Sequence, residues 1–194
     1  DISTASISDS HFEHSGNDAV DLMTTQAVIA GSVFKNNGDK GISVGENSKL
    51  YALNNKFEGN VVGVQSKDRS TAILINQSLT DNKTALHAYK KNWRYGEGGT
   101  IFLGKSTILG GEISAAAEKR SAIQIFDSYL EVPAKGKRIE TIAVDAINSR
   151  SALRDNPFPD SGRINSRLAD PIRNIPSEIL EQILASQRGS VVDD

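Results

Sequence analysis

The 194-residue chain contains no cysteine, one tryptophan, one methionine and five prolines. The absence of cysteine excludes a disulfide scaffold and cysteine-ligated zinc or iron–sulfur sites. A run of about 18 apolar residues, which a membrane-spanning helix requires, does not occur. The 22 Lys and Arg nearly balance the 24 Asp and Glu, and this balance argues against a dedicated nucleic-acid-binding protein.

The first three-quarters of the chain follows a repeat of about 22 residues. Large apolar residues recur two positions after a small polar one at intervals of 22, 23, 22, 29 and 22 residues. These anchors are Phe12, Phe34, Phe57, Leu79, Ile108 and Leu130. A second apolar set stands five positions before each anchor and comprises Ile7, Ile29, Ala52, Leu74, Leu103 and Ile125. The alternation of apolar and polar positions around these sets predicts a strand with one buried face.

A second strand repeats in the same register. Its apolar anchors, Val20, Ile42, Val64 and Leu86, are each 22 residues apart. Asparagines follow three positions after successive anchors of the first strand, at Asn37, Asn60 and Asn82. Asparagine tolerates the left-handed conformation of sharp turns, and stacked asparagines can hydrogen-bond along a ladder. The repeat therefore predicts polar corners between short strands.

Short strands at a fixed period, without intervening helices, indicate an all-β solenoid in which stacked turns bury a common core. The repeat corresponds to about six turns of a single-stranded parallel β-helix. A β-propeller is the main alternative, but one blade needs about 40–45 residues, which is two of these units. An ordinary β-sandwich is the other alternative. The single 22-residue step favours the solenoid.

The segment from Ser32 to Ile42 resembles right-handed parallel β-helix proteins of the pectate-lyase-like superfamily, and the resemblance extends roughly from Ile2 to Ile147. It implies a right-handed coil, but it does not select an activity, because this architecture hosts lyases, hydrolases, epimerases, adhesins and inert spacers. The stretch from Gly38 to Glu46 also resembles β-helical regions attached to larger bacterial envelope proteins. We therefore expect a secreted or cell-envelope location and an upstream domain in a longer chain.

Three parts are expected along the chain: a β-helix over residues 1–147, an irregular linker or wrapping segment over 148–175, and a helix with a tail over 176–194. The linker is marked by Pro157, Pro159 and Pro171. Pro176 and Gly189 bound the short amphipathic helix. Its apolar stripe comprises Ile179, Leu180, Ile183 and Leu184. This helix is expected to cap or pack against the solenoid, or to dock a partner.

The repeat stretches by seven residues at the insert, Tyr89 to Gly99, which contains the only tryptophan, Trp93. Inserts in solenoids form loops on one face, often the binding face. The insert and the neighbouring strand therefore predict a binding surface for an acidic polysaccharide, on which aromatic rings stack against sugars and basic groups hold carboxylates. The predicted ligand-binding residues are Gln65, His87, Lys90, Trp93, Arg94 and Tyr95. Alternatively, the aromatic side chains fold back to cover the solenoid.

The outward positions of the second strand form one expected row of Asp21, Ser43, Gln65 and His87. Together with the following corner, they supply candidate catalytic residues: Asp21, Glu46, Lys67, Asp68, His87 and Lys90. Basic groups would suit a lyase, and paired acids a hydrolase. The acids Asp18 and Asp21 could share a calcium ion, and no other cofactor or metal is expected. An ordinary ladder of opposite charges on a solvated strand face is the competing interpretation.

Three functions follow as hypotheses. The first is an extracellular or envelope β-helix module that binds an acidic polysaccharide. A wider version of this hypothesis adds that the module also processes the polysaccharide. The second is a non-catalytic structural or adhesive spacer of a larger surface protein. The third is a polysaccharide lyase or hydrolase in its own right.

Overall fold

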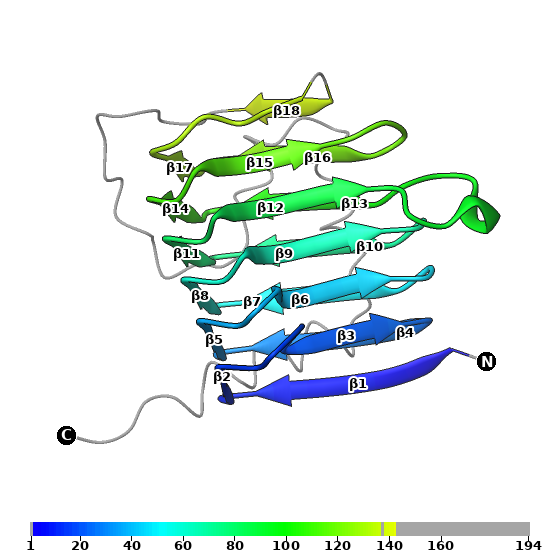
Figure 1. Ribbon diagram of the computed structural model, residues 1–194, viewed down its shortest axis with the longest axis horizontal. Helices are drawn as coiled ribbons and strands as arrows, with labels where there is room; N and C mark the ends of the chain where they lie inside the picture. Colours follow the sequence, from blue (N-terminus) through cyan, green and yellow to red (C-terminus); the bar gives the residue numbers. More distant parts are fainter. Residues whose placement is uncertain (1, 137, 143–194) are drawn as a thin grey trace.

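The computed structural model describes residues 2–136 and 138–142, which coil into a parallel β-solenoid of about six turns (Figure 1). Each full turn contributes one strand to each of three sheets, which form the walls of the coil. The repeat of about 22 residues thus corresponds to one turn of the coil. The expected solenoid is confirmed, and the propeller and sandwich are excluded.

Sheet A has seven strands: β1 (Ser3–Ser8), β4 (Thr25–Ala30), β7 (Lys49–Leu53), β10 (Thr71–Ile75), β13 (Thr100–Gly104), β16 (Ala122–Phe126) and β18 (Ile139–Ile142). Sheet B has six: β2 (His11–Glu13), β5 (Val33–Lys35), β8 (Lys56–Glu58), β11 (Ser78–Thr80), β14 (Thr107–Leu109) and β17 (Tyr129–Leu130). Sheet C has five: β3 (Val20–Met23), β6 (Lys40–Gly45), β9 (Val62–Lys67), β12 (Thr84–Tyr89) and β15 (Ile113–Ala117). The paired strands within each sheet are parallel.

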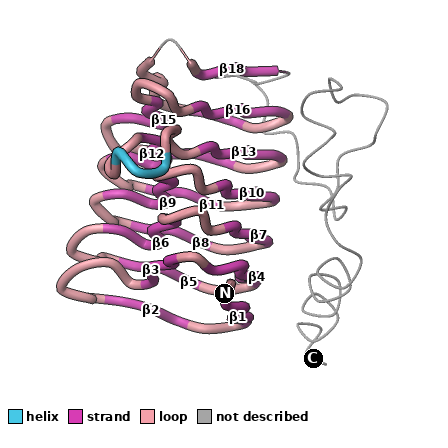
Figure 2. Tube along the Cα trace, turned by 90° about the vertical axis from the view of Figure 1, so that its right-hand side faces the viewer, coloured by secondary structure: helices cyan, strands magenta, loops and turns pink. Residues whose placement is uncertain are grey.

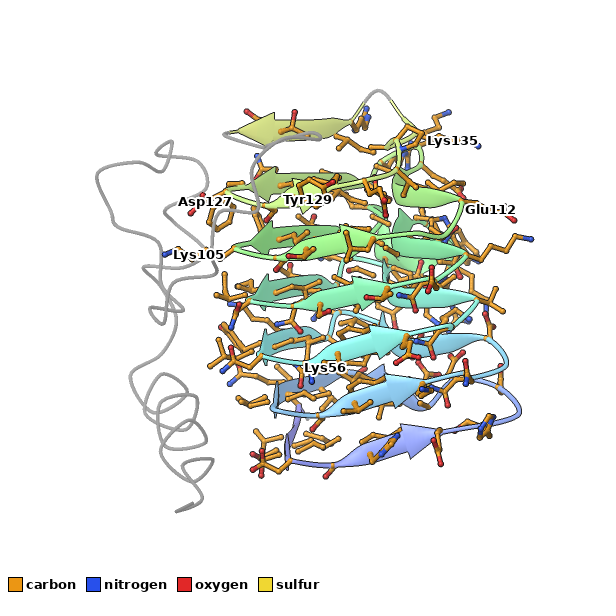
Figure 3. The ribbon with its side chains drawn as sticks, turned by 90° about the vertical axis from the view of Figure 1, so that its left-hand side faces the viewer. Lys56, Lys105, Glu112, Asp127, Tyr129 and Lys135 are labelled. Carbon is orange, nitrogen blue, oxygen red and sulfur yellow. The ribbon has the colours of Figure 1, made fainter. Side chains whose placement is uncertain are left out.

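A single residue with positive φ marks the corner between sheets A and B in each turn: Asp9, Gly31, Asn54, Asn76, Lys105 and Asp127. Lys105 and Asp127 lie at the same edge of the coil, one turn apart (Figure 3). This corner corrects the sequence analysis, which interpreted the first strand as continuous and expected two strands per turn. Ile29 and Phe34 both point inward although they are five positions apart, an odd spacing that an unbroken strand does not allow.

The core fills the inside of the coil with the repeating residues. Phe12, Phe34 and Phe57 stack with ring centroids 5.1 and 4.9 Å apart, and Leu79, Ile108 and Leu130 continue the row. The predicted anchors of the second strand, from Val20 to Leu86, pack into the same cluster. Small and medium side chains from three walls therefore fill the interior, and this explains the low aromatic content of the chain.

Polar ladders run along the coil beside the apolar core. Asn37, Asn60 and Asn82 are buried and form the expected asparagine ladder, with Nδ2 to Oδ1 distances of 2.8 Å at both steps. Each asparagine oxygen also accepts the backbone N–H one turn earlier. A second ladder serves the corner between sheets A and B and comprises Ser10, Ser32, Asn55, Gln77, Ser106 and Ser128. These ladders satisfy buried backbone groups that the strands leave unpaired at the corners.

The last described strand, β18, lies at the end of sheet A and ends at Ile142. The expected boundary at residue 147, the linker over 148–175 and the helix with its tail over 176–194 lie outside the described residues. Within the described part of the chain, no helix is long and apolar enough to cross a membrane.

Candidate functional site

The insert over residues 89–99 leaves the coil between β12 and β13 and carries the short 3-10 helix η1 (Trp93–Tyr95) (Figures 1 and 2). Trp93 is 80% exposed, the largest exposed fraction among the large apolar side chains of the described residues. Arg94 is also exposed, and Tyr95 is half-buried. The alternative in which Trp93 folds back onto the solenoid is therefore wrong for this side chain.

The start of the insert is held by a buried carboxylate one turn earlier. Asp68 is 1% exposed, and its Oδ1 accepts the backbone N–H groups of Lys91 at 2.8 Å and Asn92 at 2.6 Å. The Asn92 side chain in turn accepts the N–H of Arg94 and caps η1. These hydrogen bonds fix where the helix begins and, with it, the position of Trp93.

The end of the insert is tied to the turns on both sides. Gly98 donates its N–H to Arg120 O at 2.8 Å, and its carbonyl accepts the N–H of Arg69 at 3.0 Å. The carbonyl of Gly96 accepts from Lys90 Nζ and from Arg120 Nη1, each at 2.9 Å. The long loop is therefore cross-linked into the solenoid at both ends.

Basic side chains gather where sheet C runs into sheet A around this insert. We call this surface the corner patch, and it consists of Trp93 and the exposed cations Arg69, Lys91, Arg94, Lys119 and Arg120. The backbones of Arg69 and Arg120 bind Gly98 from either side, and this places the two arginines on neighbouring turns. The exposed acids on the same corner segments are Glu97 and Glu118. Cations thus outnumber acids on a surface that includes the exposed ring of Trp93.

The outer row of sheet C has the expected register but not the expected exposure. Asp21, Ser43, Gln65 and His87 stand in register on neighbouring strands. Asp21 is exposed and His87 half-buried, but Ser43 is 0% and Gln65 4% exposed. The expectation that the whole row faces solvent is therefore wrong for its two middle members.

Lys67 accounts for part of this burial. Its side chain extends across Gly45, where a Cβ atom would overlap the lysine stem. Its ammonium donates to Ser43 Oγ at 3.2 Å and lies 4.0 Å from Asp21 Oδ1. Lys67 is itself only 9% exposed. The candidate base and the candidate acid Asp21 therefore contact each other across the sheet face.

His87 is engaged at both ring nitrogens. Its Nδ1 lies 3.3 Å from Gln65 Nε2, and its Nε2 lies 3.0 Å from Glu118 Oε1. With the Gln65 amide as donor, Nδ1 accepts and Nε2 carries the proton toward Glu118. The imidazole also stacks on Tyr89 at 4.9 Å between centroids. Burial raises the pKa of the Tyr89 hydroxyl above its usual value.

Lys40 occupies the position beside the proposed calcium pair. Its ammonium binds Asp18 Oδ1 at 3.1 Å and also Asp39. Burial lowers the pKa of Lys40, but the hydrogen bonds and charges of Asp39 and Asp18 outweigh it, so the net pKa is raised. Among the described residues, no group of three or more acidic, histidine or cysteine side chains is placed to hold a metal ion.

The remaining candidate catalytic residue, Glu46, is half-buried at the corner before β7.

The predicted site residues did not include Glu118 or four cations of the corner patch, Arg69, Lys91, Lys119 and Arg120. Arg69 adjoins the predicted Asp68 and Lys91 lies within the insert, whereas Glu118, Lys119 and Arg120 belong to a later turn. These last three residues come one turn after the insert, where the step is 29 residues rather than 22. The 29-residue step from Leu79 to Ile108, carried over to the second strand, aligns His87 with Ala116. Continued by two residues, the same register places Glu118 beside Tyr89. The signal was present in the spacing of the anchors.

Most of the candidate catalytic groups are bound by neighbours. Asp68 holds the insert, Lys67 holds Ser43, Lys90 binds a backbone carbonyl, and both His87 nitrogens have partners. A general base needs a free lone pair in reach of its substrate. The corner patch, by contrast, has an exposed indole ring and exposed cations, of which Arg120 also donates one N–H to Gly96 O. The arrangement is thus suited to binding an extended anion.

The comparison with known families agrees with the geometry of the coil. The family described as a right handed beta helix region matches residues 1–129. No curated protein and no solved structure matches the chain. The match covers about two-thirds of the chain and nearly all of the described turns. The chain belongs to the right-handed beta helix region family.

Proposed function

We propose that this protein is an extracellular or envelope β-helix module that binds an acidic polysaccharide at the corner patch. The observation that carries the proposal is Trp93, which is 80% exposed on a loop held from both sides. The backbone that carries this indole is held by hydrogen bonds, so less conformational freedom is lost when a ligand stacks on the ring than would be lost on a free loop.

The chemistry of the patch selects the ligand class. The flat indole of Trp93 offers an apolar surface to the C–H face of a sugar ring. The guanidinium groups of Arg69 and Arg94 match carboxylates with two parallel N–H donors. Arg120 already donates from Nη1 to Gly96 O and adds a third positive charge. These charges come from neighbouring turns, which are about 4.8 Å apart. A polymer with a carboxylate on each sugar meets several of them at once.

The engagement of the candidate catalytic groups favours binding without turnover. A spacer that binds no glycan is the alternative, and it predicts that the patch is inert. A lyase is the other alternative, and it predicts the release of unsaturated uronate. The location outside the cell is part of the proposal and rests on the ligand class.

A binding array distinguishes these functions. Purified chain is applied to immobilised polygalacturonate, alginate and a neutral glucan, together with the variants Trp93→Ala and Arg94→Gln. We expect binding to the acidic polymers and at least about a tenfold loss in Trp93→Ala, which corresponds to about 1.4 kcal/mol. Lys56→Gln is the matched charge control, because Lys56 is exposed on sheet B, away from the insert (Figure 3).

Two outcomes contradict the proposal. Unchanged binding in Trp93→Ala would place the ligand elsewhere, and no binding by the unsubstituted chain would favour the spacer. Absorbance of unsaturated uronate during incubation with polygalacturonate would instead favour a lyase.

A further inference from the structure

The outer face of sheet A is apolar, unlike the outer face of sheet C. Side chains at alternate positions of β4, β7, β10 and β16 point away from the core, and these strands are in register along sheet A. We call this set the sheet A outer face, and it comprises Val28, Ala30, Tyr51, Leu53, Ile73, Ile75 and Phe126. Each member is 5% exposed or less. The equivalent positions of sheet C carry Asp21, Ser43, Gln65 and His87.

Nothing among the described elements lies across this face. The strands form the three walls of one coil, and η1 is the only helix of the described part. The insert that carries η1 projects away from the coil (Figure 1). The low exposed fractions of these side chains are those of a covered surface, and an uncovered apolar face of this size would be unfavourable in water.

Tyr51 at the centre of the face supports this requirement. It is 1% exposed, and its hydroxyl has no hydrogen-bond partner among the described residues. A buried tyrosine hydroxyl normally finds a partner. The ammonium of Lys49 lies 5.4 Å from the centre of the Tyr51 ring and adds a positive charge at the edge of the face. The face thus presents an apolar strip, a hydroxyl and a cation to its cover.

We propose that the chain's own C-terminal segment covers the sheet A outer face, with the helix predicted over Ser177–Arg188 lying along the axis of the coil. The strands from β4 to β16 are five neighbours in sheet A, so the face spans about 19 Å at about 4.8 Å per strand. Twelve helical residues at 1.5 Å each span about 18 Å. The predicted helix therefore matches the face in length.

The chemistry of the two surfaces also matches. The stripe of Ile179, Leu180, Ile183 and Leu184 supplies the apolar side chains. Glu178 and Glu181 flank this stripe and complement Lys49. Thirty-four residues, 143–176, separate the end of β18 from the helix. Extended chain spans about 3.3 Å per residue, so this connection exceeds the length of the face several times over. The last described strand, β18, belongs to the sheet that carries this face.

The absence of cysteine from the chain makes disulfide trapping a direct test. The double variant Ile73→Cys with Ile183→Cys is prepared as the full chain and oxidised mildly, and its disulfides are mapped by mass spectrometry. We expect an intrachain disulfide between the two positions. The matched control pairs Ile73→Cys with Ala185→Cys, which lies on the opposite side of the predicted helix, and we expect at least a tenfold lower yield.

Other occupants of the face give different results. A helix that caps the end of the coil would cross-link to Ile139→Cys in β18 rather than to Ile73→Cys. A second copy of the chain on this face would give interchain disulfides and a dimer. Either result overturns the proposal, as does an equal yield from the Ala185→Cys control.

Hydrogen exchange of the unsubstituted chain tests the proposal without any change to the face. We expect amide protection over residues 177–188. Exchange at the rate of a free peptide throughout this segment would contradict the docking of the helix.

Discussion

The asparagine ladder is expected to be a main source of stability, and Asn60→Ala measures its contribution. Asn60 is 2% exposed and stands in the middle of the ladder. Its Oδ1 accepts from the backbone N and the Nδ2 of Asn37, at 3.1 and 2.8 Å. Its Nδ2 donates to Phe34 O at 2.9 Å and to Asn82 Oδ1 at 2.8 Å. The substitution removes all four hydrogen bonds.

The cost follows from these four bonds. A net contribution of about 1 kcal/mol each gives a loss of about 4 kcal/mol in the free energy of unfolding, because the abandoned partners stay buried. Urea unfolding followed by circular dichroism measures this loss. Asn17→Ala is the matched control, since Asn17 is exposed, and its expected cost is below about 0.5 kcal/mol. A loss below about 1 kcal/mol in Asn60→Ala would refute the reasoning, because each bond would then contribute far less than a buried hydrogen bond normally does.

Three further predictions concern the insert and the effect of pH. Asp68→Ala removes two hydrogen bonds between a carboxylate and backbone amides, so we expect a loss of about 3 kcal/mol and a lower fluorescence anisotropy of Trp93. Asp68→Asn keeps the acceptor oxygen, so it should retain most of the stability and most of the Trp93 anisotropy. Equal effects of the two variants would contradict the anchoring role. Gly99→Ala places a Cβ atom on the backbone of the preceding turn, so we expect a destabilisation of about 1–3 kcal/mol by thermal unfolding, whereas an unchanged melting temperature would disprove the close approach. The pKa values of Tyr89 and Lys40 are raised above their usual 10.0 and 10.5, so the folded state binds their protons more tightly and loses this stabilisation as the pH rises through the raised values. The melting temperature should therefore fall above about pH 10, less steeply in Tyr89→Phe, and identical slopes for the two proteins would contradict the tyrosine contribution.

The sequence predicts the coil and its ladders well because each turn repeats the same physical requirement. An inward residue such as Phe34 must meet Phe12 and Phe57 one turn away, so the period is written directly into the spacing of large side chains. Asn37, Asn60 and Asn82 follow the same rule. The third strand of each turn was missed because the corner needs only one residue of positive φ. Asn54 meets this need, and the polar pair Asn54 and Asn55 after the apolar Leu53 was the turn signal in the sequence.

The exposure of the site residues is less predictable, because it depends on where long side chains extend. Strand alternation places Ser43 and Gln65 outward, and this direction is correct. Their burial depends on neighbours such as Lys67, whose stem crosses Gly45 to reach an earlier strand. A flexible side chain selects this path among several rotamers, and the spacing of residues does not encode the choice. Trp93 is the opposite case, since an insert in a solenoid signals a surface loop.

Trp93 also offers the most direct test of the proposed binding function. It is the only tryptophan in the chain, so intrinsic tryptophan fluorescence reports on the corner patch alone. We expect polygalacturonate to change this fluorescence saturably at low salt, and we expect the apparent affinity to weaken as salt rises, because the exposed cations are screened within about 10 Å at 0.1 M. A neutral glucan should have little effect. Fluorescence that does not respond to any acidic polysaccharide at low salt would contradict the account.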